Sequence, residues 1–361
     1  MNALEQQLQY PLAELLPALG QAIDVAPGIR WLRMKLPFAL DHINLWMLRD
    51  RLDGREGWTL VDCGIADDAT RNAWEQVFAT HLDGLPVLRL IVTHMHPDHI
   101  GLSDWLTRRW STAEHDCRMW ISATDYITAL LATTVNTGVG GDAAALFMAS
   151  HGLSDPEAVA KIRGRSNYYA SMVPGIPPSY RRMLDGDRIG IGVHEWHCIA
   201  GYGHAPEHIS LHCESLGVMI SGDMVLPRIS TNISVLSHEP EADSLKLFLD
   251  SLDRLRLLPD DTLILPSHGR PFYGLHTRIA QLQTHHADRL ADILNACEQT
   301  PQTAADLLAV LFPRKLDLHQ TTFAMGEAIA HLNLLWHQGR LQRSIGHADG
   351  IIRFSKVPLL T

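Results

Sequence analysis

Three histidines and one aspartate fall within six residues of one stretch, His94-Met95-His96-Pro97-Asp98-His99. They directly follow the apolar run 87–92, which predicts a buried strand, so we expect the cluster at the C-terminal end of that strand. Neutral imidazoles and a carboxylate are ligands that suit zinc and other borderline divalent metal ions. A chance histidine-rich loop is the alternative, because the chain holds 21 histidines among its 361 residues. The preceding strand and the partners found downstream argue against it.

Three more polar signatures follow or border predicted strands further along the chain. The first, at 203–208, contains His204 and His208, the second ends in Asp223, and the third contains His268. Four separate strand ends therefore deliver histidine or aspartate side chains, as a site at the edge of a layered sheet requires. The ligand candidates number seven, namely His94, His96, Asp98, His99, His204, Asp223 and His268. Seven groups are too many for one tetrahedral ion, but they suit two ions that share a bridging carboxylate.

Composition describes an ordinary globular protein, with 46% hydrophobic and 19% charged residues. The net charge of −10 argues against a general binder of nucleic acids or anionic membranes, whose surfaces are basic. We expect neither a secretory signal nor a transmembrane helix, because the N-terminus lacks the first pattern and no run of 18 apolar residues occurs. The five cysteines are scattered without CxxC spacing. That usage favours reduced thiols in a cytoplasmic enzyme.

The elements expected along the chain predict a catalytic domain over residues 1–284. Residues 1–27 begin with a helical pattern that prolines and glycines interrupt, and strand-like runs then fill residues 29–61. A long helical segment, at about 125–182, separates these strands from a second series over 188–221. Long inserts in compact enzymes tend to be functional. We therefore interpret 125–182 as a helical insertion that forms a lid or a substrate channel.

Residues 285–361 predict a separate, winged-helix-like domain. Helices are expected over 286–297, after a capping box that begins at Thr303, and over 322–338, and a β-hairpin follows. Seven basic and seven acidic residues give this segment no net charge. This charge balance is weak support for binding in a groove of a nucleic acid. A wall of the substrate pocket or a homodimer contact is the favoured role, and RNA or DNA docking is the alternative.

The order and spacing of the seven candidates resemble those of the metallo-β-lactamase superfamily, whose signature is His-x-His-x-Asp-His followed by His, Asp and His. The resemblance covers about residues 25–284, including Asp62-Cys63-Gly64, which is similar to the early Asp-x-Gly of the family. It implies an α/β fold, a four-layer αββα sandwich. The C-terminal domain resembles the tail of a subgroup that includes β-lactamase-like hydrolases and an RNA-cutting member.

Position by position, the resemblance also implies a role for each candidate. His94, His96 and His204 would bind one ion. Asp98, His99 and His268 would bind the other, and Asp223 would bridge the two. Asp62 would orient a ligand or the loop beneath the site. His208 would be an eighth ligand, so we interpret it as a packed neighbour of the ligands.

Two divalent ions so arranged lower the pKa of a bridging water and supply hydroxide at neutral pH, and Asp98 is placed to accept or relay a proton. Zinc suits these ligands, although iron and manganese accept the same donors. The predicted reaction is hydrolysis of a small activated acyl compound, a thioester or a lactone-type ester. A phosphodiesterase or an RNA- or DNA-processing nuclease is the alternative. Three residues are candidates for contacts with the substrate, namely Arg228, Asn232 and Tyr180.

Overall fold

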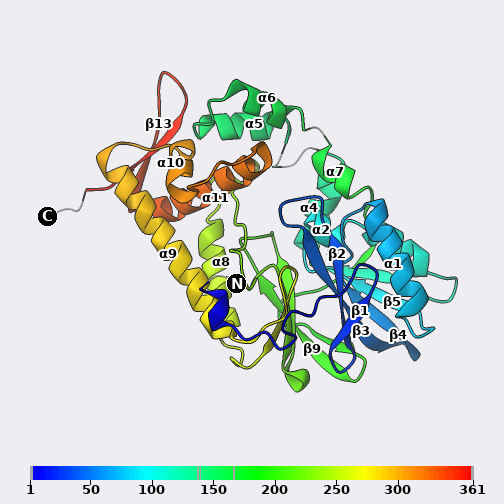
Figure 1. Ribbon diagram of the computed structural model, residues 1–361. Helices are drawn as coiled ribbons and strands as arrows, with labels where there is room; N and C mark the ends of the chain where they lie inside the picture. The colour runs from blue at the N-terminus through cyan, green and yellow to red at the C-terminus, as the bar shows by residue number, and fades with distance from the viewer. Residues whose placement is uncertain (1–2, 136–137, 139, 166, 359–361) are drawn as a thin grey trace. The chain divides into compact units, whose positions relative to one another are not determined.

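The computed structural model describes residues 3–135, 138, 140–165 and 167–358 (Figure 1). Residues 136–137, 139 and 166 of the predicted insertion therefore lie outside the described part. The chain divides into two compact units. The first comprises residues 1–134, 169–231 and 251–279, and the second comprises 135–168, 232–250 and 280–361. The second unit thus combines part of the predicted insertion with the C-terminal segment, a division that differs from the predicted one at residue 284.

A seven-stranded sheet forms one half of the first unit. Its strands follow the chain in order: β1 (Ala22–Ala26), β2 (Ile29–Lys35), β3 (His42–Leu52), β4 (Arg55–Val61), β5 (Val87–Ile91), β6 (Arg118–Ile121) and β7 (Tyr180–Arg182). β1 to β4 pair antiparallel, and β4 to β7 pair parallel. The C-terminal ends of β4, β5 and β6 therefore meet at one edge of the sheet.

A five-stranded sheet forms the other half, in the order β12-β11-β10-β9-β8. The strands are β8 (Arg188–Ile191), β9 (His194–Gly201), β10 (His208–Cys213), β11 (Val218–Gly222) and β12 (Leu263–Pro266). β11 and β12 are parallel, and β10 runs against β9 and β11. The ends of β9, β11 and β12 and the start of β10 consequently share an edge. Backbone bonds from Ile209 N–H to Thr93 O and from Asn44 N–H to Ser267 O join this edge to the first sheet.

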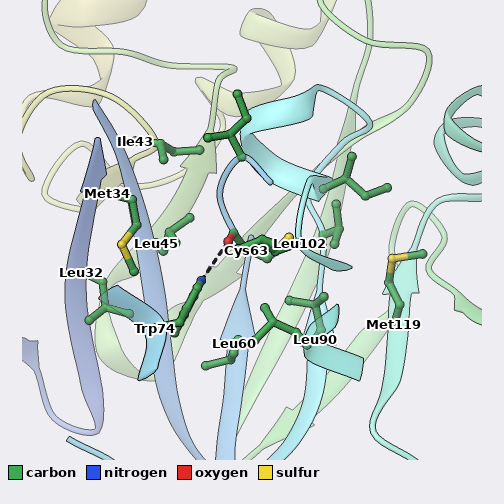
Figure 2. Close-up of a cluster of buried hydrophobic side chains, with 14 of the residues drawn as sticks. Leu32, Met34, Ile43, Leu45, Leu60, Cys63, Trp74, Leu90, Leu102 and Met119 are labelled. Carbon is green, nitrogen blue, oxygen red and sulfur yellow. Dashed lines mark hydrogen bonds between the residues drawn. The ribbon is translucent and has the colours of Figure 1, made fainter. Parts of the chain in front are cut away.

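Side-chain alternation along the strands divides the apolar residues between two cores. On β2, Trp31 faces the second sheet and stacks on Trp46, with ring centroids 6.2 Å apart. Leu32 and Met34 face the opposite side and share a core with Trp74 (Figure 2), a residue of α1 (Asp68–Thr80). α3 (Ser103–Trp110) contributes Leu106 to the same core. Trp74 of α1 donates its indole N–H to Cys63 O at 2.9 Å. This bond fixes the helix against the chain that leaves β4.

The remaining helices of the first unit lie close to strand ends. They are α2 (Pro97–Ile100), α4 (Ala123–Ala132) and most of α7 (Tyr168–Met172). Two long helices contribute to both units, α8 (Ser244–Leu255) and α9 (Leu275–Gln299). In the first unit, Arg254 of α8 binds Ala200 O at the end of β9 and the carboxylate of Asp185. The last turn of α8 thus contacts the end of β9 in the second sheet. The mixed α/β fold class predicted from the sequence is confirmed.

The second unit brings the helical insertion against the C-terminal segment. Its further elements are α5 (Gly141–Ser150), α6 (Pro156–Arg163), α10 (Ala304–Leu311), α11 (Leu318–His337), β13 (Leu341–Ile345) and β14 (Ile352–Lys356). The predicted capping box of Thr303 and Asp306 begins α10. Ala305 N–H donates to His151 O at 3.1 Å, so the end of α5 meets the start of α10. Three helices precede the hairpin as predicted, while the winged-helix assignment stays a prediction.

The helical pattern at the N-terminus does not produce a long helix. A short 3-10 helix spans Glu5–Gln7, and β1 follows later. Gln9 instead pairs with Tyr273, with N–H to O distances of 3.2 and 2.8 Å between their backbones. A tertiary contact therefore overrides the local pattern. None of the helices in the described residues has the length and apolar character needed to cross a membrane.

Glu327 of α11 gives the second unit a measurable pH dependence. Burial raises the pKa of this carboxyl to about 7, although Arg289 opposes the shift. The native state then holds a proton that the unfolded chain loses near pH 4.3. Stability is therefore expected to fall as the pH rises from about 4.5 to about 7, and Glu327→Gln should gain about 1–3 kcal/mol at pH 8. Denaturant unfolding at pH 5 and pH 8 measures this difference, and the exposed Glu157→Gln serves as the control. Equal pH profiles for the wild type and Glu327→Gln would contradict the prediction.

Candidate metal centre

All seven predicted ligands belong to the first unit and lie at or just beyond strand ends. His94 and His96 follow β5, and Asp98 and His99 lie in α2. Pro97 restricts the preceding residue to extended backbone, and His96 accordingly has φ −63° and ψ 147°. The chain turns there into α2, so the ligand candidates before Pro97 and those after it can face two different metal positions. His204 follows β9, Asp223 follows β11, and His268 follows β12.

Three imidazoles meet in the first ligand group. His94 Nε2 lies 2.9 Å from His96 Nδ1 and 3.2 Å from His204 Nε2, and the last two atoms are 3.1 Å apart. A tetrahedral zinc ion bound at about 2.0–2.1 Å separates its nitrogen ligands by about 3.3 Å. The three nitrogens therefore surround a point that one ion can reach from all of them.

Asp98, His99 and His268 form the second group. Asp98 Oδ2 lies 3.5 Å from His268 Nε2 and 3.7 Å from His99 Nε2. Asp223 contacts both groups through different oxygens. Its Oδ2 lies 3.3 Å from His204 Nε2, whereas its Oδ1 lies 3.4 Å from His268 Nε2 and 3.6 Å from His99 Nε2. This arrangement suits a carboxylate that bridges two ions.

Neighbouring groups fix the ring nitrogens that face the centre. His99 Nδ1 lies 2.8 Å from Asp62 Oδ2 and donates to this acceptor, which leaves Nε2 as a lone-pair donor toward the second group. His268 Nδ1 likewise donates to His42 O at 2.7 Å. Asp62 also accepts from Thr93 N–H at 2.7 Å, so one carboxylate orients both a ligand and the loop that carries four of them. The resemblance implies that Asp62 orients a ligand or the loop beneath the site, and this role stays a prediction.

The buried polar atoms of the second group fit a cation. His99 Nε2 and Asp223 Oδ1 are buried without a hydrogen-bond partner among the described residues, and such atoms are costly unless something satisfies them. Burial opposes protonation of His99, but Asp62, Asp98 and Asp223 raise its pKa well above its usual range. Burial and neighbouring imidazoles hold the pKa of His94 well below its usual range. The first ligand group is therefore made of neutral imidazoles. The second group, together with Asp223, is rich in negative charge.

His208, the first residue of β10, holds the backbone next to the candidate metal centre. Its Nε2 accepts the backbone N–H of Asp223 at 3.1 Å, and its ring lies 4.9 Å from that of His94. It belongs to none of the ligand groups. A Cβ at Gly222, whose φ is +52°, would lie 2.1 Å from His208 Nε2. Glycine at this position allows the imidazole to hold the loop of Asp223.

Asp125 is a supporting residue that the sequence interpretation missed. Its carboxylate accepts Met95 N–H at 2.8 Å and Glu207 N–H at 2.7 Å. It thereby joins the loop of His96 to the loop of His204. Burial raises its pKa to about 6, and the two backbone donors oppose that shift. Its position just after β6, at the same sheet edge as the histidine cluster, is the signal that could have identified it.

The three residues predicted to contact the substrate lie in different surroundings. Arg228 is exposed, 3.9 Å from Glu5, and lines a pocket that also contains His268. Tyr180 stacks on Tyr126 with ring centroids 3.9 Å apart and packs against the helix-side core, so packing accounts for its position. Asn232 belongs to the second unit, where it accepts the hydroxyl of Ser234 at 2.8 Å.

Asp62→Asn should weaken the second ligand group without unfolding the protein. The amide can still accept the Thr93 N–H, but it removes the charge that holds the His99 ring in its tautomer. Substitution of such a partner costs about 10- to 100-fold in metal affinity or activity. Competition with a chelator measures the affinity, and Asp67→Asn, at the N-cap of α1, is the control. Unchanged affinity in Asp62→Asn would show that the contact does not position His99.

Comparisons with known proteins agree with this geometry. A family model described as the metallo-beta-lactamase superfamily matches residues 40–268, and one described as the metallo-beta-lactamase-like C-terminal domain matches residues 290–357. The probable metallo-hydrolase YqjP of Bacillus subtilis is 25% identical over 311 residues, which cover 84% of this chain and 91% of that protein.

Two solved structures resemble the whole chain. A beta-lactamase domain protein from Burkholderia ambifaria is 53% identical with a TM-score of 0.93, and the match covers 99% of this chain and 100% of that one. A metallo-beta-lactamase family protein from Thermus thermophilus is 27% identical with a TM-score of 0.71, and the match covers 92% and 99% of the two chains.

Proposed function

The chain belongs to the metallo-beta-lactamase superfamily and is a metal-dependent hydrolase, and from this premise we propose that it cleaves a small activated acyl compound. A thioester is the first choice of substrate and a lactone-type ester the second. The supporting observation is the pair of ligand groups that share Asp223, one oxygen facing each group. The net charge of −10, and the absence of any net charge on the C-terminal segment 285–361, favour a small substrate over a nucleic acid.

The chemistry divides between the ions and the protein. When bound by the two ligand groups, two divalent cations, zinc in this proposal, would lower the pKa of a coordinated water and polarise the carbonyl oxygen of the substrate. Asp98 has the side chain best placed for proton transfer, because it is 19% exposed whereas those of His99 and His268 are 0% and 2% exposed. It takes a proton from the attacking water and releases it to the departing sulfur. The water oxygen bonds to the acyl carbon as the carbon–sulfur bond breaks.

Two side chains and one backbone carbonyl, that of His42, hold this arrangement in place. Asp62, His42 and His208 hold His99, His268 and the backbone of Asp223, respectively. The ligands then need no rearrangement before the water attacks the substrate. Groups held in position in this way lower the activation barrier of the reaction. The five buried cysteines carry free thiols, which supports a cytoplasmic location for the enzyme.

Thiol release tests this function. Purified protein loaded with zinc should release thiol from acyl-glutathione or acyl-coenzyme A, and His96→Ala should release none while keeping its thermal transition. Elemental analysis should find about two ions per chain. Absence of release across a panel of thioesters and lactones would refute the acyl proposal. Salt-sensitive binding of RNA would then favour the nuclease alternative.

A further inference from the structure

A pocket of about 620 Å³ in the first unit shares His268 with the candidate metal centre. His42 and Gly269 line it beside His268, and Leu16 and Pro227 contribute apolar surface. Its volume lies in the range of small-molecule sites, which is roughly 300–1,000 Å³. An occupant of this pocket would therefore lie directly next to the second ligand group.

Three guanidinium groups distinguish this pocket, those of Arg33, Arg228 and Arg270. Arg33 is half-buried on β2, and the one hydrogen bond of its guanidinium group to the described residues is long, 3.3 Å from Nη1 to Gly269 O. It forms no ion pair within 4 Å in the described part of the chain, whereas Arg270 and Arg228 contact Glu14 and Glu5. A desolvated guanidinium without a carboxylate partner is costly, so a ligand that supplies the missing anion would be favoured.

The acidic residues of the pocket do not neutralise Arg33. Asp41 attracts it, but the side chain of Asp41 is 82% exposed and binds His42 Nδ1 at 2.6 Å. Glu14 is similarly exposed and pairs with Arg270, while Glu5 is buried near Arg228. The carboxylates are therefore committed to other partners or to water. Positive charge remains at Arg33, close to His268.

Tyr10 adds a hydroxyl group that has no hydrogen-bond partner in the part of the chain that the structure describes. Its ring lies 4.4 Å below the Arg270 guanidinium and contacts Phe272, which holds the side chain in place. Its phenolic oxygen is buried and has no hydrogen-bond partner among the described residues. Burial raises the pKa of Tyr10 to about 12, so the hydroxyl keeps its proton at neutral pH. The residues that line the pocket therefore include one hydroxyl group that has no acceptor among the described residues.

We propose that this pocket binds an anionic oxygen group of the substrate, a carboxylate or a phosphate, through Arg33 and the Tyr10 hydroxyl. Arg33 supplies the planar fork that suits such groups, and Arg270 adds charge from across the Tyr10 ring. The inference rests on the proposed acyl hydrolysis and narrows its substrate to a charged acyl compound. The apolar residues of the pocket then accommodate the carbon chain between the anion and the scissile bond.

Matched thioesters test the substrate side of this inference. The first series keeps one scissile thioester bond and varies the group on the thiol side. S-acetyl-3-mercaptopropionate carries a carboxylate there, its primary amide carries no charge, and S-acetyl-2-mercaptoethyl phosphate carries a phosphate. S-succinyl and S-acetyl thioesters of one neutral thiol place the charge on the acyl side instead. Wild-type protein should have the lower KM for a charged member of at least one series. The preferred member identifies the anion and the side that carries it.

Two variants test the residues. Arg33→Met should raise the KM of the preferred anionic substrate at least about tenfold, which corresponds to the loss of a charged hydrogen bond, and leave the neutral analogue unchanged. Tyr10→Phe removes a hydroxyl that bonds nothing else among the described residues, so it should raise the same KM several-fold with the fold retained. Arg30→Met is the matched control, because Arg30 lies on the same strand but outside this pocket.

Direct binding separates the failure of this inference from the failure of the proposed function. Calorimetric titration of metal-loaded protein with succinate and with inorganic phosphate should show affinity for one of them that Arg33→Met weakens at least tenfold and Arg30→Met does not. Thioester hydrolysis with equal KM values for charged and neutral substrates, or binding that Arg33→Met does not weaken, would overturn the anion pocket alone. Absence of hydrolysis with Arg33-dependent binding would overturn the acyl reaction and leave the pocket standing.

Discussion

Asp223→Asn should lower kcat/KM of the hydrolysis by about three orders of magnitude, a loss of roughly 4 kcal/mol of transition-state stabilisation. The carboxylate of Asp223 places one oxygen 3.3 Å from His204 and the other 3.4 Å from His268. An amide supplies one acceptor oxygen and no charge, so it can serve only one of the two groups. Both ions should therefore bind more weakly, and elemental analysis should find fewer than two per chain.

The fold should survive this substitution, because the backbone of Asp223 is held independently of its side chain. Its N–H donates to His208 Nε2, and its carbonyl accepts the hydroxyl of Thr231. Asp104→Asn on α3 is the matched control, since its carboxylate pairs with Arg108. The bridging assignment is wrong if Asp223→Asn keeps two ions and full activity. Equal losses in Asp104→Asn would indicate a general effect on folding.

Arg89→Leu should destabilise the first unit by about 3 kcal/mol, because it leaves a buried carboxylate without its cation. The side chains of Arg89 and Asp50 are 1% and 0% exposed and lie 2.8 Å apart. Arg89 also donates to Gly190 O on β8, so the pair connects the two sheets. Asp50 still accepts the N–H of Gly192 in this variant. The expected loss of stability therefore lies at the lower end of the range for buried ion pairs that lose one partner.

Chemical denaturation of the wild type and Arg89→Leu measures this cost. Arg188→Leu is the control, since its pair with Glu195 is 65% and 54% exposed and should contribute less than about 1 kcal/mol. A loss in Arg89→Leu no larger than the control would contradict a desolvated pair. Adding Asp50→Asn to Arg89→Leu should restore part of the stability, because the uncompensated charge is then removed.

The local part of the metal centre could be predicted because its residues are close in sequence or follow strands. His94, His96, Asp98 and His99 share one loop, and the strands before His204 and Asp223 have recognisable apolar runs. The family membership that these residues implied is confirmed by the model matched over residues 40–268. Their metal-binding roles remain predictions, which the substitutions above test.

Contacts between distant segments were not accessible from the sequence. The carbonyl that orients His268 belongs to His42, 226 positions earlier, and no local pattern connects the two. The pocket around Arg33 likewise depends on Tyr10, at the end of a segment for which helical periodicity gave the wrong expectation. Such sites arise from chain topology, whereas periodicity and spacing report only on neighbours along the chain.

The contacts of Asp125 limit which substitutions the two neighbouring loops can accept. Its one carboxylate accepts backbone N–H groups from Met95 and Glu207, in loops whose ligands His96 and His204 are 108 positions apart. A substitution that shifts either backbone is transmitted to the other loop. The effects of substitutions at Met95 and Glu207 on stability are therefore expected to be non-additive.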